Sequence, residues 1–140
     1  MAEALTIGAI EAARQNIAAK VVVTPTHNWR GPAVTRAMGE GTEIVLKLEP
    51  FQHTGTFKAR GALLNLLSLS AEELARGVTA VSAGNHAIAT AFAAQILGAD
   101  AKVVMMKSAN PFRVSQCRAY GADIVFAEDI HQAFDKVKQI

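Results

Sequence analysis

Alternating strand-like and helix-like segments in the second half of the chain most constrain how it can fold. Short apolar runs, each followed by a helical pattern, lie at 78–81, 102–106 and 124–126, with the helical patterns at 85–97, 110–120 and 129–138. The triplet Gly-Ala-Asp stands at 98–100 and at 121–123, where each glycine is placed to end a helix. Such alternation is typical of right-handed βαβ units. The sequence therefore predicts a three-layer α/β fold with an open parallel sheet.

The first half of the chain shows weaker patterns. Apolar residues recur at helical spacing over 6–19, and Ser70 with Glu73 forms the pattern of a capping box, so a helix is predicted at each place. Pro25 biases the residue before it toward an extended backbone. The other predicted segments are an extended run at 21–26, a loop at 27–30, a weak helix at 33–38, a strand at 43–48 and a helix at 57–69.

The composition predicts one folded domain of ordinary size. The chain has 140 residues, of which 51% are hydrophobic and 19% charged, so it can bury a core and is not disordered by composition. The net charge is +2, and the basic residues are scattered along the chain. Because no basic stripe with interleaved aromatic residues is present, nucleic-acid binding is not expected.

The sequence also favours a cytoplasmic protein. Residues 1–4 carry neither the basic nor the apolar region of a signal peptide, and no apolar run reaches the roughly 18 residues of a membrane span. The single cysteine, Cys117, excludes an internal disulfide and fits a reducing compartment. Because Cys117 lies in a helical pattern, it is predicted to be a small core side chain rather than a nucleophile.

Lys58 is the first candidate for covalent chemistry. It follows a Gly-containing turn and opens an apolar, helix-forming run within the segment 54–62. The partial positive charge of a helix N-terminus disfavours an ammonium group there and favours the free amine that Schiff-base chemistry requires. Most lysines in a protein of this kind are merely solvated, so the weight given to Lys58 comes from its surroundings.

A second junction has the features of an anion site. The loop 82–86, which reads Ser-Ala-Gly-Asn-His, follows a predicted strand and opens a predicted helix. Backbone N–H groups at such a point suit a carboxylate or phosphate group. Since this loop and Lys58 both follow predicted strands, we expect both at the carboxyl edge of the sheet. The histidines His27, His53 and His131 lack metal-ligand spacing, and no metal site is predicted.

Together these segments resemble a known enzyme family. The matching residues are Lys47, Leu48, Glu49, Gln52, the run 54–62 and the loop 82–86. They resemble the fold-type-II pyridoxal-phosphate (PLP) enzymes, and within them the branch of serine/threonine dehydratases and serine racemases. The resemblance covers nearly the whole chain, and it implies a tryptophan-synthase-β-like fold in incomplete form. Ala59 stands where cysteine-synthase and threonine-synthase relatives typically carry Asp, which favours the dehydratase branch.

The resemblance implies a role for each matched residue. Lys58 would form a Schiff base with the aldehyde of PLP and act as acid and base at the substrate α-carbon. Phe57 would pack against the cofactor ring or serve as an ordinary core residue, and Asn85 would hydrogen-bond the phenolic oxygen of the cofactor. The substrate carboxylate would be bound at the helix start by Ser82, Ala83, Gly84, Asn85 and His86.

The implied reaction is an α,β-elimination. A hydroxy amino acid such as threonine or serine would be converted to a 2-oxo acid and ammonia. A racemase-like isomerase and a non-catalytic α/β fragment stay as alternatives, although Ala83 stands where serine racemases have a second catalytic serine. A nucleotide-binding domain is disfavoured because no Gly-x-Gly-x-x-Gly follows a strand. Thr56, Ile88 and Arg113 depart from the usual Ser, Gln and Lys, and Ile88 leaves the substrate preference open.

The resemblance also implies a domain division. Members of the family run to roughly twice this length, which fits two domains, and their Gly-rich phosphate loop and the residue facing the pyridine nitrogen are not found in this sequence. Residues 1–54 would belong to the larger PLP domain, 55–140 would form the small α/β domain, and the rest of the larger domain would be absent. An N-terminal fragment that binds PLP weakly and forms a homodimer is therefore expected.

Overall fold

The computed structural model describes residues 5–140, so the segment 1–4 used in the signal-peptide argument lies outside the described residues. The helices are α1 (Ile7–Ile17), α2 (Pro32–Met38), α3 (Lys58–Leu67), α4 (Ala71–Ala75), α5 (Asn85–Leu97), α6 (Pro111–Ala119) and α7 (Ile130–Val137). The strands are β1 (Thr26–Trp29), β2 (Ile44–Lys47), β3 (Val78–Val81), β4 (Ala101–Met106) and β5 (Asp123–Ala127). Single turns of 3-10 helix, named η1 to η3, lie at Ala18–Lys20, Glu49–Phe51 and His53–Gly55.

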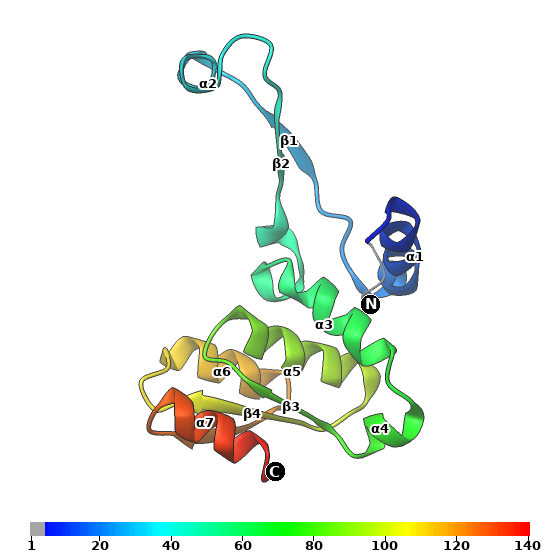
Figure 1. Cartoon of the computed structure of the whole chain (residues 1–140), viewed down its shortest axis with the longest axis vertical. Helices are drawn as coiled ribbons and strands as arrows, with labels where there is room; N and C mark the ends of the chain where they lie inside the picture. Colours follow the sequence, from blue (N-terminus) through cyan, green and yellow to red (C-terminus); the bar gives the residue numbers. More distant parts are fainter. Residues whose placement is uncertain (1–4) are drawn as a thin grey trace.

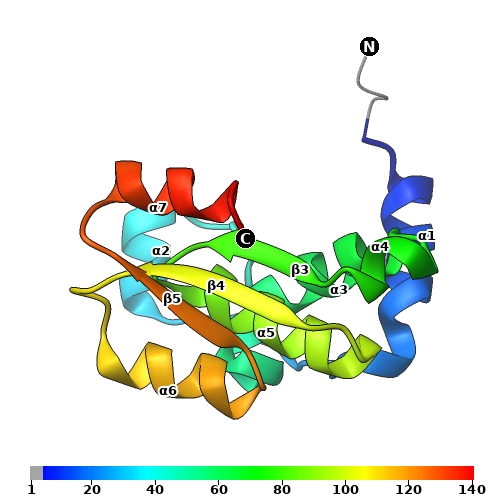
Figure 2. The ribbon, with the colours of Figure 1, turned by 90° about the horizontal axis from the view of Figure 1, so that it is seen from below.

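A parallel sheet forms the centre of the fold. Its strands lie in the order β3, β4, β5, with Val78 opposite Ala101 and Lys102 opposite Asp123. Helices α5 and α6 cover one face of the sheet and α7 covers the other, as Figure 2 shows. This arrangement confirms the predicted three-layer fold built from βαβ units. Helix α3 packs on the outer side of α5 and adds a further layer (Figure 1).

Local capping signals place several helix ends as predicted. The Ser70 hydroxyl accepts the N–H of Glu73 at 3.2 Å, and the Glu73 carboxylate accepts the N–H of Ser70 at 2.8 Å, so the capping box is present. Helix α5 spans the predicted residues and ends at Gly98, whose φ of 68° lies in the left-handed region. A glycine there ends a helix without the steric cost of a Cβ atom.

Small side chains allow α5 to lie between the sheet and α3. Four alanines of α5 have 0% of their surface exposed, namely Ala87, Ala89, Ala91 and Ala93. Because these side chains are short, the α5 backbone can pack closely on both β4 and α3. Leu63 of α3 is also 0% exposed and belongs to the same core cluster. A smaller cluster on the opposite face, which includes Val104 and Ala133, holds α7 on the sheet.

Strands β1 and β2 form a separate antiparallel hairpin, in which Thr26 pairs with Lys47 and Trp29 with Ile44. The hairpin projects from the α/β body and carries α2 at its far end (Figure 1). The prediction of a loop at 27–30 is therefore wrong. Thr26 and Trp29 are common in strands, but Asn28 is not, and the apolar alternation of a strand is absent. Pairing with β2 supplies the hydrogen bonds that the local sequence could not reveal.

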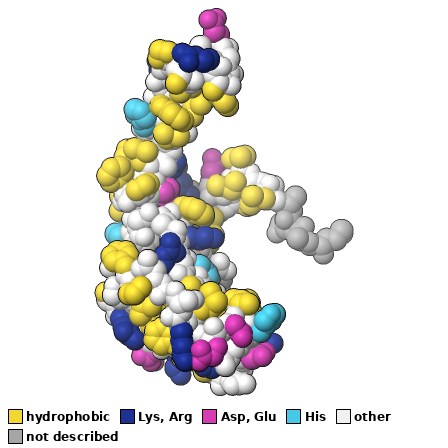
Figure 3. Space-filling model, turned by 90° about the vertical axis from the view of Figure 1, so that its left-hand side faces the viewer, with side chains coloured by type: hydrophobic (Ala, Val, Ile, Leu, Met, Phe, Trp, Pro, Cys, Tyr) yellow, Lys and Arg dark blue, Asp and Glu magenta, His cyan; other side chains and the backbone are white. Residues whose placement is uncertain are grey.

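Apolar side chains are exposed along the hairpin arm and on α1. Figure 3 shows hydrophobic side chains along the arm and on α1, and others over the α/β body. Among them are Ile7, Ile10, Trp29, Met38, Val45 and Leu46. Exposed apolar surface of this kind commonly marks a contact face.

The structure confirms the prediction that Cys117 is a core side chain. Its side chain has 0% exposure, and burial raises the pKa of its thiol to about 11. The thiolate is the reactive form, so both access and ionisation are suppressed. We expect Cys117 to react with iodoacetamide at pH 8 at least roughly a hundred-fold more slowly in the folded chain than in 6 M guanidinium. Mass spectrometry of the alkylated chain over time measures both rates, and equal rates would contradict the buried position.

Candidate active site

Lys58 is the first residue of α3 and lies exposed. Its backbone N–H donates to the Thr56 hydroxyl at 3.3 Å, and its Nζ lies 5.3 Å from the centroid of the Phe57 ring. No hydrogen bond or ion pair occupies this amine within residues 5–140. Phe57 is 59% exposed, so the alternative of an ordinary core residue is wrong. The helix start therefore presents an accessible amine beside an accessible aromatic ring.

The turn before Lys58 has an unusual backbone. Thr54, with φ of 65°, and Gly55, with φ of 67°, both lie in the left-handed region, which a β-branched residue such as threonine rarely adopts. The Thr54 hydroxyl is buried and is the one buried side-chain polar atom of the described chain without a hydrogen-bond partner. Backbone strain beside an exposed amine is typical of a functional turn.

The loop 82–86 follows β3 and opens α5. The Gly84 N–H donates to the Ser82 hydroxyl at 3.1 Å, which shapes the loop, and Gly84 caps the helix without a side-chain bond. The first N–H groups of α5, including those of Asn85 and His86, have no acceptor inside the helix. A Cβ atom on Gly84 would lie 2.8 Å from Nη1 of Arg113, so a guanidinium lies directly beside this loop. The loop thus combines free donors with positive charge.

Lys58 and the loop 82–86 lie at the starts of two neighbouring helices, α3 and α5. Strand β2 belongs to the hairpin, and η2 and η3 separate it from α3. Lys58 therefore does not follow a strand of the parallel sheet, whereas the loop 82–86 does. Helix α3 nevertheless begins on the side of the body where β3 ends and α5 begins (Figure 1). Helices α3 and α5 pack together. Within the described chain, no hydrogen bond or ion pair joins Lys58 to the loop.

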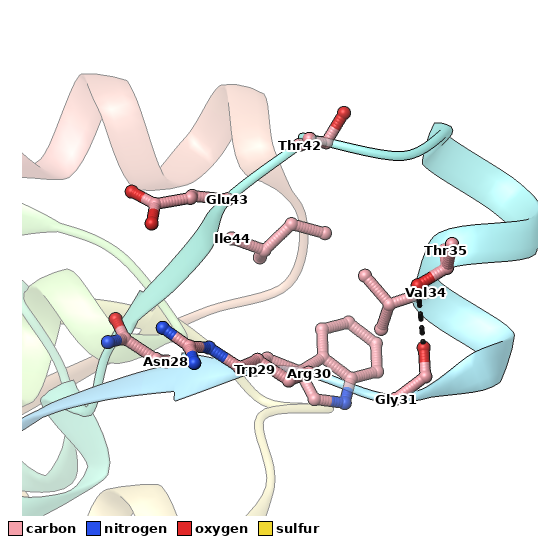
Figure 4. Close-up of a pocket in the computed structure, with 10 residues that line it drawn as sticks. Asn28, Trp29, Arg30, Gly31, Val34, Thr35, Thr42, Glu43 and Ile44 are labelled. Carbon is pink, nitrogen blue, oxygen red and sulfur yellow. Dashed lines mark hydrogen bonds between the residues drawn. The ribbon is translucent and has the colours of Figure 1, made fainter.

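A hollow of about 410 Å³ lies elsewhere, between the hairpin and α2. Trp29, Val34 and Ile44 point into it, and the Thr35 hydroxyl donates to the Gly31 carbonyl beside it (Figure 4). This hollow includes no residue of α3 or of the loop 82–86. Its lining residues include no pair of groups suited to covalent chemistry.

The sequence did not predict a polar network that joins the first turn of α3 to two earlier segments of the chain. Arg60 donates to both carboxylate oxygens of Glu49, from Nε at 2.9 Å and from Nη2 at 2.8 Å. The Thr24 hydroxyl donates to the same carboxylate at 2.6 Å. The sequence contained a hint, because Glu49 and Arg60 flank the lysine turn, but the contact with Thr24 joins residues far apart in the chain.

This network predicts a measurable acid dependence of stability. The hydrogen bonds from Arg60 hold the pKa of Glu49 below its ordinary value of 4.5. A depressed carboxyl pKa contributes stability above the unfolded-state value that is lost as the pH falls through the folded-state value. We expect Glu49→Gln to lose about 1–2 kcal/mol of unfolding free energy at pH 7 and less as the pH falls below about 4.5.

Urea unfolding of both proteins between pH 3 and pH 7 measures this difference. Hydrogen bonds from Ser70 also lower the pKa of Glu73. Because both proteins retain Glu73, subtracting one pH profile from the other isolates Glu49. A difference that stays constant across the pH range would contradict the assignment.

Two kinds of feature are absent from the part of the chain that the structure describes. Within 5–140, no helix is both long enough and apolar enough to cross a membrane. The same residues contain no cluster of three or more histidine, cysteine, aspartate or glutamate side chains suited to a metal ion.

The family of the chain follows from comparison with known proteins. Residues 17–140 match the model of the family described as pyridoxal-phosphate dependent enzymes. The chain belongs to this family. It is 57% identical over 100 residues to the phenylserine dehydratase of Ralstonia pickettii, a match covering 71% of the chain and 31% of that relative. It is 38% identical over 131 residues to the catabolic L-threonine dehydratase of Escherichia coli K12, covering 91% of the chain and 38% of that relative.

Solved structures of family members have the same fold. Maize serine racemase superposes with a TM-score of 0.86 at 31% identity, over 98% of the chain and 41% of that protein. The threonine deaminase of T.th. superposes with a TM-score of 0.79 at 34% identity, over 96% of the chain and 41% of that protein. The chain thus spans about a third of the length of the curated relatives it matches.

The residues around Lys58 have the chemistry needed to hold the aldehyde end of PLP. An accessible amine without a protein partner is the group that reacts with an aldehyde, and the exposed Phe57 ring offers an apolar face beside it. The free N–H donors of the loop 82–86 fit an anionic group. The described residues therefore fit the aldehyde end of the cofactor and a carboxylate.

Proposed function

We propose that this chain supplies the lysine-bearing part of a PLP-dependent lyase acting on β-hydroxy amino acids. The observation that carries the proposal is the accessible Lys58 amine at the start of α3, close to a strained turn. The names of two relatives, a phenylserine dehydratase and a threonine dehydratase, support elimination of water as the reaction. The products would be a 2-oxo acid and ammonia.

Each residue of the proposed site has a distinct task. When bound, PLP supplies an electron sink that acidifies the proton on the substrate α-carbon. Lys58 holds the cofactor aldehyde through its Nζ, and the same amine later takes the α-proton. Phe57 would hold the face of the cofactor ring, and Asn85 would donate a hydrogen bond to the cofactor's phenolic oxygen.

The loop 82–86 binds the substrate carboxylate in this proposal. Its backbone N–H groups and the positive end of the α5 dipole stabilise the negative charge. The residues that form this subsite are Ser82, Ala83, Gly84, Asn85 and His86. Fixing the carboxylate there orients the α-carbon toward a base, and orientation of this kind contributes strongly to rate.

Ala83 favours elimination over racemisation. Racemisation needs a base on one face of the α-carbon and a proton donor on the other, whereas elimination requires a base on one face only. The methyl group of Ala83 cannot donate or accept a proton. Similarity to maize serine racemase keeps racemisation as the second outcome to be measured.

We further propose that residues 1–54 pack against a larger domain and that 55–140 form the small domain of the enzyme. The exposed apolar side chains on α1 and along the hairpin support this division, because such surfaces are normally covered. A homodimer in the cytoplasm completes the proposal. The buried, uncrosslinked Cys117 is compatible with a reducing compartment.

A chimera tests the proposed activity. In it, this chain replaces the matching segment of the Ralstonia pickettii phenylserine dehydratase. We expect the chimera to release 2-oxo acid from phenylserine, threonine or serine, and the same chimera with Lys58→Ala to release none. Chiral chromatography of the remaining amino acid measures racemisation in parallel. A folded chimera that binds PLP but forms neither a 2-oxo acid nor the other enantiomer of the amino acid would refute the lyase proposal.

A further inference from the structure

The start of α3 lacks the usual means of fixing a helix N-terminus. Phe57 at the N-cap position makes no side-chain capping bond, and the first turn has no acidic residue. The hydrogen bond from the Lys58 N–H to the Thr56 hydroxyl, at 3.3 Å, is long. A helix start without a good cap loses about 1 kcal/mol and tends to fray. Something else must keep this turn ordered.

The strained turn before α3 is anchored on both sides. On one side, the Gln52 side chain accepts the N–H of Val22 at 3.0 Å and donates to the Val22 carbonyl at 2.8 Å. On the other side, Arg60 binds Glu49 through two hydrogen bonds and reaches the Val22 carbonyl at 3.3 Å. The left-handed backbone of Thr54 lies between these anchors. A conformation of that kind persists only where its surroundings enforce it.

Arg60 and Lys58 project from different sides of α3. Successive residues of an α-helix turn by about 100°, so side chains two residues apart point roughly 200° apart. Arg60 binds the segment 22–24 and η2, whereas the Lys58 amine makes none of these contacts. The ion pair is partly shielded, with 29% of the Arg60 side chain and 15% of the Glu49 side chain exposed. Two parallel hydrogen bonds in such a site fix orientation as well as distance.

We propose that the ion pair of Glu49 and Arg60 is a positioning clamp for the Lys58 amine. It fastens the first turn of α3 to η2 and to the segment 22–24, and so replaces the missing helix cap. Glu49 and Arg60 are positioning residues, since neither touches the amine. This inference rests on the proposed function, because it concerns how the proposed reactive amine is presented.

Amide hydrogen exchange of the 140-residue chain tests the clamp. In Glu49→Gln and in Arg60→Lys, which keeps the charge but loses the paired donors, amides of residues 56–61 are expected to exchange at least roughly ten-fold faster. Amides of β4, beyond α5, are expected to change by less than about two-fold. A purely global loss of stability would speed exchange in both regions alike.

Reaction with PLP followed by borohydride gives a second readout. The rate of label incorporation at Lys58, divided by that at the exposed Lys102 in the same sample, is expected to fall at least roughly five-fold in both variants. Glu128→Gln is the matched control, because it breaks the ion pair with Lys107, in which both side chains are 62% exposed. That exposed pair contributes little, so neither readout should move.

These measurements distinguish failure of the clamp proposal from failure of the proposed function. Folded Glu49→Gln and Arg60→Lys variants with exchange at 56–61 within about two-fold of the parent would overturn the clamp. Should both variants unfold, Thr24→Val removes the 2.6 Å hydrogen bond to Glu49 and the 3.4 Å hydrogen bond from Arg60 but keeps the ion pair, and exchange at 56–61 must then rise by at least roughly two-fold. If the parent chain labels Lys58 no faster than Lys102, the proposed function fails, while the exchange data still decide on the clamp.

Discussion

Replacing Lys58 with alanine is expected to abolish specific pyridoxylation of the chain. The Lys58 amine is exposed, free of hydrogen bonds and ion pairs in the described residues, and lies at a helix start. By contrast, the amines of Lys47 and Lys136 donate to backbone carbonyls, and those of Lys107 and Lys138 lie in ion pairs. An imine with PLP forms only at an unprotonated amine and is trapped by borohydride. Removing the reactive amine removes the reaction itself, so the expected effect is complete loss of the label from the peptide that contains residue 58.

Peptide mass spectrometry after reduction measures this label at each lysine. Lys102→Ala is the matched control, because Lys102 is exposed on β4 and belongs to no proposed site. We expect Lys102→Ala to retain the label at Lys58 in full. Equal labelling of all exposed lysines, unchanged by Lys58→Ala, would mean that the described residues do not single out this amine. Lys58→Arg, which keeps the charge, excludes a purely electrostatic explanation for any loss.

Local signals explain what the sequence predicted well. The bounds of α5 are correct because a glycine stands at each end, Gly84 before the first turn and Gly98 after the last. The capping box of α4 needs only Ser70 and Glu73, three residues apart. Short-range patterns also predict the alternation of strands and helices from β3 to β5, so the parallel sheet could be predicted without knowledge of any long-range contact.

Long-range pairing explains what the sequence could not reveal. Strand β1 exists because Thr26 and its neighbours pair with β2, which lies in a separate segment of the chain, and the local pattern resembled a loop. The clamp joins Thr24, Glu49 and Arg60 from three separate segments. Each of these side chains alone is an unremarkable polar residue. Only the fold brings them together, so the sequence singled out Lys58 as a candidate but did not predict the network beside its helix.

Leu63→Ala disturbs the packing of α3 on α5, and we expect it to cause the largest loss of unfolding free energy among the substitutions proposed for this chain. Leu63 has 0% exposure and lies in the main core cluster, so its removal leaves a cavity that fixed neighbours cannot fill. Such substitutions cost about 2–5 kcal/mol, a large share of the roughly 5–15 kcal/mol by which a domain is stable. Urea unfolding followed by far-UV circular dichroism measures the loss.

The control for this prediction is Ile96→Ala, which removes an apolar side chain that is 44% exposed on α5. Because less surface is buried there and water can fill the space, its cost should be less than about half that of Leu63→Ala. Equal losses would contradict the packing of α3 in the core. Since Lys58 lies five residues before Leu63 on the same helix, a helix that is free to shift on α5 could not present the amine in a fixed place. The stability of this interface therefore links the core to the chemistry proposed for Lys58.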